Sequence, residues 1–511
     1  MREFFLAAAI ACAPLAAMAQ VADPSTASQP RYSVMEKVMV PMRDGVRISA
    51  DIYMPTSPTG SAARFPVILQ RWSYGRKANG TDDVAKYFAS NGYVYVSSDM
   101  RGTHDSEGVY YMHDPVNDPN DGHDLVEWLA AQPWSTGAVG TYGASYGGHT
   151  QYNTALGKPP HLKAQFLVNA VTEYQDGGGA WSEGAWMGDH NLSHTLRGIL
   201  YMTSTKNDPG LQKYVQSIQA NYDAWLAQPA AAQLELLKPS PAAAKWFGDW
   251  LNHPNFDAYW AAYGINPTRY ADYPDIPVFF WGAWYDHMQR PFLKTYMGLR
   301  DAGTAYRPMM SGPWDHVGQE RSNGDVDFGP TAAVERVAVA KAWFDRWLKG
   351  EQGATQPPVR IFVMGTGDGH KTAEGKLYHG GYWRDEREYP LARTRYVSYF
   401  LDNKGALVTG KPAGGKPDKF ALDPNHPVPT LVGRVGGAYN QRCSVKIKGC
   451  DDDKPLSARS DVLVYRTTPL DHDVEVTGPI SVTLNFKSDA KDTDFAVKLV
   501  DEYPASADFP D

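Results

Sequence analysis

The sequence predicts an α/β protein whose core is a mostly parallel sheet with helices on both faces, followed by an all-β domain. Strand-like and helix-like segments alternate over residues 46–169 and again over 277–349. The stretch between them is helical, and after residue 357 short apolar segments alternate with turn residues. Parallel neighbouring strands need a crossover connection, usually a helix, so the alternation of strands and helices favours a parallel sheet. The short strands separated by turn residues after residue 357 favour a β-sandwich or jelly roll.

The N-terminal segment is predicted to be a signal peptide. Arg2 supplies a positive charge, residues 4–17 form an apolar run, and Ala17-Met18-Ala19 fits a small-x-small cleavage site. The apolar run is shorter than the roughly 20 residues that a membrane-spanning helix needs. We therefore expect residues 1–19 to be removed and the mature protein to begin at Gln20, in the periplasm or outside the cell.

The composition is that of an ordinary globular protein. The 511 residues are 43% hydrophobic and 21% charged, with a net charge of −8. Basic residues are not concentrated in any segment, so neither nucleic acid nor an anionic membrane is the expected partner.

Two cysteines, Cys443 and Cys450, would remain in the mature chain after Cys12 is removed with the signal segment. In an oxidising compartment a disulfide between them is the expected state. A metal site has less support, because two thiols alone do not complete a ligand set.

The first part of the core is predicted over residues 32–170. A hairpin is indicated by alternating apolar residues on both sides of Arg43-Asp44-Gly45. Leu125, Trp128 and Leu129 fall on one face of a helix. The expected strands are 34–41, 46–53, 66–70, 93–97, 139–142 and 164–169, and the expected helices are 82–91, 120–131 and one from about residue 147.

The core is then interrupted by a helical cap over residues 171–268 and resumes over 269–352. Within the cap we expect helices at 192–203, 211–226 and 241–251. After it we expect strands at 277–281 and 307–311 and helices at 289–302 and 330–349.

Residues 357–511 are predicted to form the all-β domain, a jelly-roll β-sandwich. The expected strands include 359–364, 396–401, 462–465 and 480–486. The sequence ends directly after a strand-like segment at 496–500, so we expect this domain to be truncated.

The segment Gly143-Ala144-Ser145-Tyr146-Gly147 fits the G-x-S-x-G pattern. It lies between a predicted strand and a predicted helix, where a nucleophile elbow holds a serine above the sheet in the α/β-hydrolase fold. The alternative is a plain glycine-rich turn. The context of the motif favours Ser145 as a nucleophile.

A serine hydroxyl needs a base, and the base needs an orienting carboxylate. In this fold the chain order is serine, acid, histidine. Asp286 follows the strand at 277–281, and His316 follows the strand at 307–311. Taken singly, the aspartate could cap a helix and the histidine could lie on the surface. His287 and Asp315 are the competing neighbours.

An oxyanion hole needs hydrogen-bond donors aimed at the developing negative charge. One candidate is the backbone N–H of Tyr146, directly after the nucleophile. The second donor usually comes from the loop after the third strand, here residues 71–76. The Tyr74 hydroxyl or a nearby backbone N–H could supply it, although a packing role for Tyr74 stays open.

Several further motifs extend these observations along the chain. They are Met42-Arg43-Asp44-Gly45-Val46 with Asp51-Ile52-Tyr53, Ser98-Asp99-Met100-Arg101-Gly102 with Ser106-Glu107-Gly108, Trp134 through Gly148, Trp281 through Asp286, Gly312-Pro313-Trp314-x-His316, Asp461 through Tyr465, and Asp492-Thr493-Asp494-Phe495. Together they resemble the cocaine-esterase-like serine hydrolases (CocE/NonD hydrolases). That family also contains X-Pro dipeptidyl-peptidases, α-amino-acid ester hydrolases and glutaryl-cephalosporin acylases.

The resemblance implies a hydrolase core, a helical cap and a C-terminal jelly roll. It implies Ser145, Asp286 and His316 as the triad, and Tyr74 with the Tyr146 N–H as the oxyanion hole. Amino-acid ester hydrolases of the family bind the substrate ammonium with a carboxylate cluster. Only Asp189 matches that cluster here, since the positions after the catalytic aspartate are Met288 and Gln289. Glu173, Asp176 and Glu183 could substitute, but a solvated cap surface is the simpler interpretation.

These observations predict a serine hydrolase that cleaves small acyl esters or amides through an acyl-enzyme, with no metal or organic cofactor. The alternatives are an X-Pro dipeptidyl-peptidase, an α-amino-acid ester hydrolase or β-lactam acylase and, more remotely, a non-catalytic protein that binds a glycan through the jelly roll. The sequence leaves homo-oligomer formation open.

Overall fold

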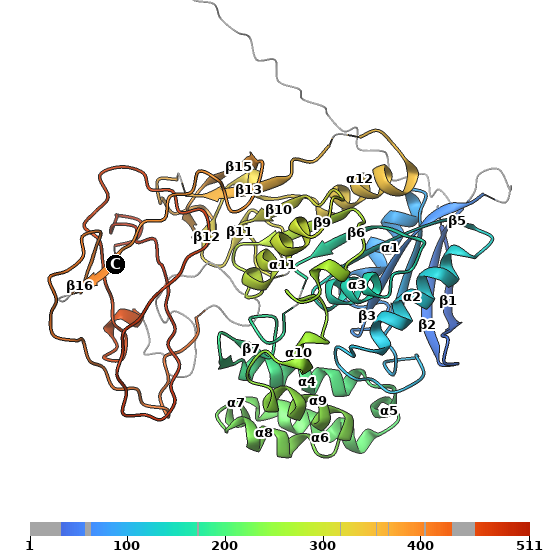
Figure 1. Cartoon of the computed structure of the whole chain (residues 1–511), viewed down its shortest axis with the longest axis horizontal. Coiled ribbons are helices and arrows are strands. Elements are labelled where there is room, and N and C mark those ends of the chain that lie inside the picture. The colour runs from blue at the N-terminus through green and yellow to red at the C-terminus, as the bar shows by residue number, and fades with distance from the viewer. Residues whose placement is uncertain are drawn as a thin grey trace, which may run out of the picture.

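The computed structural model describes residues 32–56, 63–170, 173–316, 318–353, 355–365, 367–402, 405–431 and 455–510. Its centre is a ten-stranded sheet in the order β1-β2-β4-β3-β5-β6-β9-β10-β13-β15 (Figure 1). Strands β4 to β13 in this order are parallel, and antiparallel pairs occur at both ends. The strands are β1 Tyr32–Pro41, β2 Arg47–Pro55, β3 Phe65–Trp72, β4 Val94–Asp99, β5 Ser135–Ala144, β6 Leu162–Val168, β9 Val278–Ala283, β10 Met309–Gly312, β13 Val359–Met364 and β15 Gly381–Glu386.

Helices cover both faces of this sheet. Helices α2, α3 and α11 pack on one face, and α1 and α12 pack on the other. Strand β3 shows why: Val67 and Leu69 enter the first core, and Ile68 between them enters the second. The predicted α/β class is confirmed. The helices are α1 Thr81–Ser90, α2 Asn117–Ala130, α3 Tyr146–Leu156, α11 Gln289–Asp301 and α12 Arg336–Lys349.

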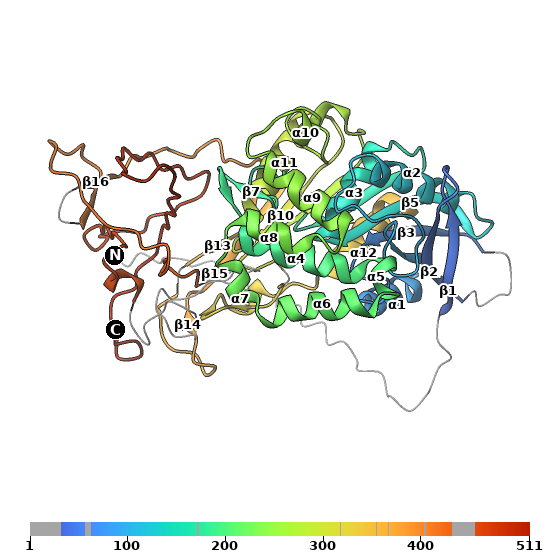
Figure 2. The same cartoon turned by 90° about the horizontal axis from the view of Figure 1, so that it is seen from below.

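The segment between β6 and β9 forms a helical cap, as predicted (Figure 2). Three of its tryptophans, Trp246, Trp250 and Trp260, form a buried core with Tyr110 and Tyr146 from the main domain. The cap therefore packs against the loops at the carboxyl edge of the sheet. It consists of β7 Trp181–Ser182, β8 Ala185–Trp186, α4 Gly188–Tyr201, α5 Thr203–Lys206, α6 Pro209–Ala220, α7 Tyr222–Leu226, α8 Ala230–Leu237, α9 Pro241–Asn252 and α10 Ala258–Ala261.

The strand at 359–364 belongs to the central sheet, although the sequence placed it in the all-β domain. As β13 it runs parallel to β10, with Val359 opposite Met309, and β15 follows antiparallel to it. Val359 and Ile361 are buried in the core of the main domain. A short alternating segment predicts a strand but does not identify the sheet that the strand joins.

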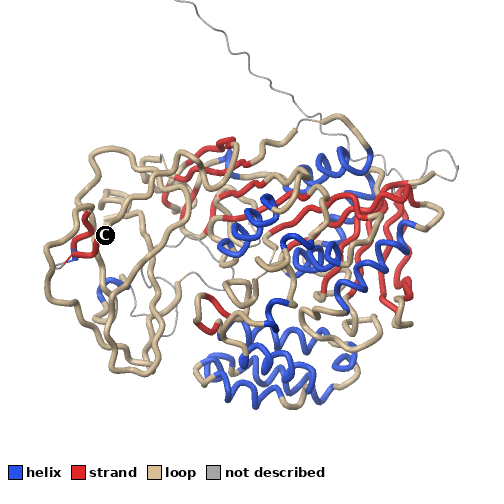
Figure 3. Tube along the Cα trace, in the orientation of Figure 1, coloured by secondary structure: helices blue, strands red, loops and turns tan. Residues whose placement is uncertain are grey.

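Past β15, the described residues are mostly loops (Figure 3). They contain the ladder of β16 Phe400–Asp402 with β17 Ala406–Val408. The segments 462–465 and 480–486 form no ladder among the described residues, so the jelly roll stays a prediction. Further short strands near the core edge are β11 Ser322–Asn323, β12 Val326–Asp327 and β14 Leu377–Tyr378.

Two predictions lie outside the described residues. These are the signal peptide at 1–19 and the disulfide between Cys443 and Cys450. Within the described part of the chain, no helix has both the length and the apolar character needed to cross a membrane.

Candidate active site

Ser145 stands in a strained turn between β5 and α3. Its backbone has φ 56° and ψ −121°, a conformation that is uncommon for a residue with a side chain. A hydrogen bond of 3.0 Å from its N–H to the Val168 carbonyl ties the turn to β6. This is the geometry of a nucleophile elbow, and it places the serine at the N-terminus of a helix, where the dipole favours negative charge.

Small residues allow the elbow to close, but not all at the positions that the motif suggests. A Cβ at Gly143 would lie 2.7 Å from the Gly147 carbonyl, and a Cβ at Gly148 would lie 2.5 Å from the Ala170 side chain. At Gly147 the nearest atom would be 3.6 Å away, an ordinary contact. The position after the motif is therefore more constrained than the last glycine of the motif.

Asp286 and His316 lie together, as their positions after neighbouring strands β9 and β10 predict. His316 Nδ1 is 3.0 Å from both carboxylate oxygens, and the Met288 N–H donates to the same carboxylate at 2.9 Å. Both side chains are buried. The pair has the arrangement in which a carboxylate fixes the tautomer of a catalytic base.

Asn169 connects this pair to the elbow, and sequence reasoning missed it. Its side-chain amide donates to the His316 carbonyl at 2.7 Å. It directly follows Val168, whose carbonyl accepts the Ser145 N–H. The residues at the end of β6 thus fix the position of the loop that carries His316 relative to the turn that carries Ser145.

The charge state of His316 depends on Asp286. Burial alone would lower the pKa of His316, but the Asp286 charge and hydrogen bond outweigh burial and raise the pKa above its usual 6.5. A base whose pKa is raised by a buried carboxylate takes a proton from a serine more readily, and as the imidazolium it can return that proton to a leaving group.

The two competing neighbours have other roles. His287 also lies 3.2 Å from Asp286, but burial lowers the pKa of His287 to about 4 in spite of that charge. The Asp315 carboxylate accepts the Gly318 N–H at 2.6 Å and so closes a turn. Asp286, His287 and His316 offer ligand atoms within 4.8 Å of one another, yet a metal there would compete with the Asp286–His316 pair.

Tyr74 lies where the oxyanion hole is predicted. Its hydroxyl is 3.5 Å from Ser145 Oγ. Burial raises the pKa of Tyr74, and the Ser145 hydroxyl, the Arg197 charge and the Tyr146 amide only partly oppose this. The hydroxyl therefore stays protonated and can donate. Because the Tyr146 amide faces the same hydroxyl, both predicted donors converge beside the serine.

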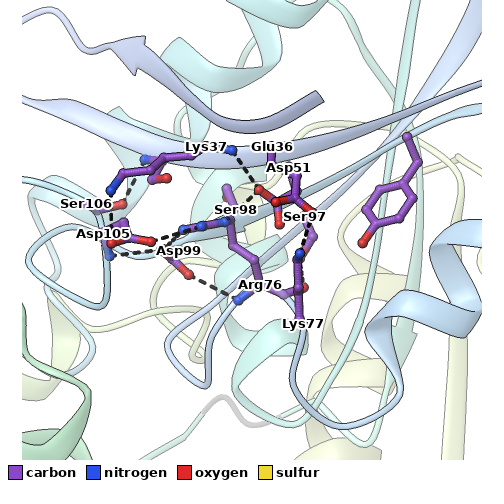
Figure 4. Close-up of polar contacts among 12 residues, drawn as sticks. Glu36, Lys37, Asp51, Arg76, Lys77, Ser97, Ser98, Asp99, Asp105 and Ser106 are labelled. Atoms are coloured by element: carbon purple, nitrogen blue, oxygen red, sulfur yellow. Dashed lines mark hydrogen bonds and ion pairs between the residues drawn. The ribbon is translucent and has the colours of Figure 1, made fainter. Parts of the chain in front are cut away.

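The loop that carries Tyr74 is held by a buried cation, Arg76 (Figure 4). The guanidinium contacts Asp51 at 3.0 Å, Asp105 at 3.0 Å and Asp99 at shorter range. The side chains of Asp51 and Asp99 are fully buried, and that of Arg76 is only 12% exposed. Such a group leaves the loop little freedom, because moving it would separate buried charges.

Asp189 lies in the first turn of α4, and its carboxylate is already engaged. The Tyr222 hydroxyl donates to Oδ1 at 2.6 Å and to the Asp189 carbonyl at 2.9 Å. A substrate ammonium would have to share this carboxylate with a cap tyrosine. The other three acidic residues considered for that task pair with cations of α11: Glu173 and Asp176 with Lys294, and Asp176 and Glu183 with Arg290.

The sequence predicted a helix at 192–203, which overlaps α4, but the side chains that α4 directs toward the site were not predicted. Arg197 acts on Tyr74, and the Tyr201 ring lies 5.9 Å from the Tyr74 ring. His190 lies 5.7 Å from His287, ring centre to ring centre. His190, Arg197 and Tyr201 are spaced by four, seven or eleven positions, a pattern that marks one helical face and could have been read from the sequence.

Comparisons with known proteins identify relatives of this chain. Residues 44–318 match the model of the X-Pro dipeptidyl-peptidase (S15) family, and residues 352–508 match the model of the X-Pro dipeptidyl-peptidase C-terminal non-catalytic domain. The chain is 32% identical over 502 residues to the cocaine esterase of Rhodococcus sp. (strain MB1 Bresler), covering 93% of this chain and 81% of that protein.

Solved structures share the fold. An aminopeptidase from a marine-sediment Thaumarchaeota archaeon superposes with a TM-score of 0.67 at 22% identity, over 88% of this chain and 75% of that one. An α-amino-acid ester hydrolase superposes with a TM-score of 0.59 at 22% identity, over 80% and 67% of the two chains.

The buried cation gives the first prediction. We expect Arg76→Met to lower kcat by about 10- to 100-fold, because a small displacement of Tyr74 weakens oxyanion stabilisation. Tyr74→Phe should cost a similar or larger factor, and the double variant little more than Tyr74→Phe alone. Steady-state kinetics measures all three.

Lys77→Met is the matched control for Arg76. Lys77 is the next residue, and its ion pair with Glu36 is exposed, so its loss should change kcat little. Arg76→Lys keeps a positive charge among the carboxylates and should therefore fold, so it tests the position of the loop in a folded protein. Losses that simply multiply in the Tyr74→Phe/Arg76→Met variant would contradict the positioning role.

The pKa of His316 gives the second prediction. The neutral imidazole is the active base, so kcat/KM should rise with pH and reach half its maximum above pH 6.5. Asp286→Asn removes the charge that raises this pKa. It should move the acid limb to lower pH and reduce the plateau by about 10⁴-fold. The pH profile of kcat/KM measures both effects.

His287→Gln should leave the acid limb in place, because the pKa of His287 is already about 4. If the acid limb of the kcat/KM profile lies near pH 4 and disappears in His287→Gln, His287 and not His316 is the base.

Proposed function

Because the chain belongs to the X-Pro dipeptidyl-peptidase (S15) family, we propose that it is a serine hydrolase that cleaves acyl ester or amide bonds of small substrates. The observation that carries the proposal is the buried pair of Asp286 and His316 beside a strained serine turn. A serine with an uncommon backbone conformation between a strand and a helix is typical of a nucleophile elbow.

The proposed reaction has two steps through an acyl-enzyme. His316 takes the Ser145 proton as the hydroxyl attacks the substrate carbonyl, and Asp286 stabilises the imidazolium that forms. Tyr74 and the Tyr146 N–H donate to the oxyanion of the tetrahedral intermediate. The imidazolium then protonates the leaving alcohol or amine. Water repeats the sequence on the acyl-enzyme and releases the acid.

A second candidate is the release of dipeptides from peptides with a proline in the second position. The match to the S15 family model favours it. Such an enzyme binds the free N-terminal ammonium of its substrate, as an α-amino-acid ester hydrolase does. Asp189 is the predicted ligand for that group, and its contact with Tyr222 weakens the case. A requirement for a free amine would decide for this candidate.

We also propose that the protein is exported, that its C-terminal domain is a jelly roll, and that a disulfide between Cys443 and Cys450 closes the short loop between them. The N-terminal sequence pattern and the match over residues 352–508 support this. N-terminal sequencing of the exported protein should begin at Gln20, and thiol titration after unfolding should find no free thiol. Retention of residues 1–19, or two titratable thiols, would contradict the proposal.

A substrate panel tests the main proposal. We expect the mature protein to hydrolyse p-nitrophenyl acetate and butyrate, and Ser145→Ala to lose several orders of magnitude of the roughly 10⁶-fold acceleration that a triad supplies. An amino-acid methyl ester with its N-acetylated twin and an X-Pro-nitroanilide complete the panel. A higher kcat/KM for the free amine favours the second candidate.

A folded protein that hydrolyses none of these substrates would contradict the proposal. Circular dichroism establishes that the wild type and the Ser145→Ala variant are both folded, so a loss of activity can be assigned to the serine.

A further inference from the structure

One face of α4 belongs to a series of side chains that starts at Ser145 and ends at His316, and we call this series the ring. Most of its neighbouring members are in contact or nearly so. The shortest distances between polar atoms are 3.5 Å for Ser145–Tyr74 and 3.4 Å for Arg197–His194. The distances between ring centres are 5.9 Å for Tyr74–Tyr201, 3.9 Å for His194–His190, 5.7 Å for His190–His287 and 5.0 Å for His287–His316. Arg197 and Tyr201 are one helical turn apart on α4.

The two histidines that α4 contributes to this ring are neutral at physiological pH. Burial lowers the pKa of His190 well below 6.5 and the pKa of His194 to about 3. His194 Nδ1 lies 2.9 Å from the His190 carbonyl and Nε2 lies 3.4 Å from the Arg197 guanidinium. A neutral ring with its proton on Nδ1 satisfies both contacts, because Nδ1 then donates and Nε2 accepts.

Arg197 therefore brings the one positive charge of α4 to this ring. In the described residues its guanidinium contacts the Ser193 carbonyl and His194, and it is in none of the ion pairs with carboxylates. Its side chain is half-buried. Several other cations in the cap and at its border pair with carboxylates, namely Lys206 with Asp105, Lys245 with Asp249 and Lys294 with Glu173.

An arginine held beside a reaction centre without an acidic partner is a ready binding group for an anion. Its planar fork of N–H groups matches a carboxylate, and partial burial strengthens the interaction. Asp286 does not serve as this partner, because its charge is directed to His316 and the Met288 N–H.

We propose that Arg197 forms a carboxylate-binding subsite, so that the preferred substrates are esters or amides with a carboxylate a few atoms from the scissile carbonyl. This inference rests on the proposed hydrolase function and specifies its substrate class. It opposes selection of an α-ammonium, since a cationic group would enter the ring beside Arg197. The reaction at the carbonyl is unchanged, and the distant carboxylate only positions the substrate.

The test compares matched acidic and neutral substrates. On the acyl side, mono-p-nitrophenyl succinate and adipate are compared with their methyl esters. On the leaving-group side, 4-carboxyphenyl acetate is compared with its methyl ester. For one of these sides, wild-type kcat/KM should favour the acidic member by about 10- to 100-fold, the range for hydrogen bonds between charged groups.

Arg197→Met should abolish this preference, because kcat/KM for the acidic member should fall by about 10- to 100-fold more than kcat/KM for the neutral member. Arg197→Lys should retain part of the preference. Lys213→Met on the cap helix α6 is the control for loss of a cap cation, and it should leave the preference intact.

The outcomes separate this inference from the function beneath it. Wild type that hydrolyses neither member would contradict the hydrolase function. Wild type that hydrolyses both equally on each side, with no change of ratio in Arg197→Met, would overturn the subsite and leave the hydrolase function standing. An equal loss for acidic and neutral members in Arg197→Met would also overturn it, since Arg197 would then act on the oxyanion or the cap.

Discussion

The hydrogen bond between the buried Asp286 carboxylate and the His316 imidazole is the contact on which the rest of the site depends. An ionised carboxylate in this position is costly unless it is fully hydrogen-bonded, and His316 and the Met288 N–H meet that requirement. The sheet order makes the pair possible. Because β9 and β10 are parallel neighbours, the loops that follow them leave the same edge side by side. His316 thereby gains a pKa suited to a base and a fixed orientation.

The remaining parts of the site are held by interactions that cross between segments distant in the sequence. Asn169 links the serine turn to the histidine loop, and Arg76 fixes the Tyr74 loop among carboxylates from β2, β4 and the loop after β4. Buried ion groups of this kind contribute little net stability compared with apolar packing. Their benefit lies in restricting the loop to one position, which an oxyanion hole requires. Asp105 also binds Lys206 of the cap, so the same network connects the core to the cap.

Much of this site could be predicted from the sequence, because the α/β order limits where chemistry can lie. A strand, a turn of small residues and a helix indicate Ser145 as the nucleophile. The positions of Asp286 and His316 directly after β9 and β10 indicate the acid and the base. What could not be predicted depends on partners brought from elsewhere. Strand β13 joins the core sheet through its pairing with β10 and the burial of Val359. Asp189 is held by Tyr222, a contact across 33 positions in the sequence. Gly148 is constrained by Ala170, which only the packed structure reveals.

The most direct test of the central claim is covalent labelling with a fluorophosphonate, followed by peptide mass spectrometry. The reagent reacts only with a serine whose proton is removed by a positioned base. We predict one adduct per chain, located on Ser145, and a large loss of labelling in His316→Ala while the variant remains folded. An adduct on another residue, or labelling of Ser145 that proceeds equally fast without His316, would contradict the assignment of Ser145 as the nucleophile and His316 as its base.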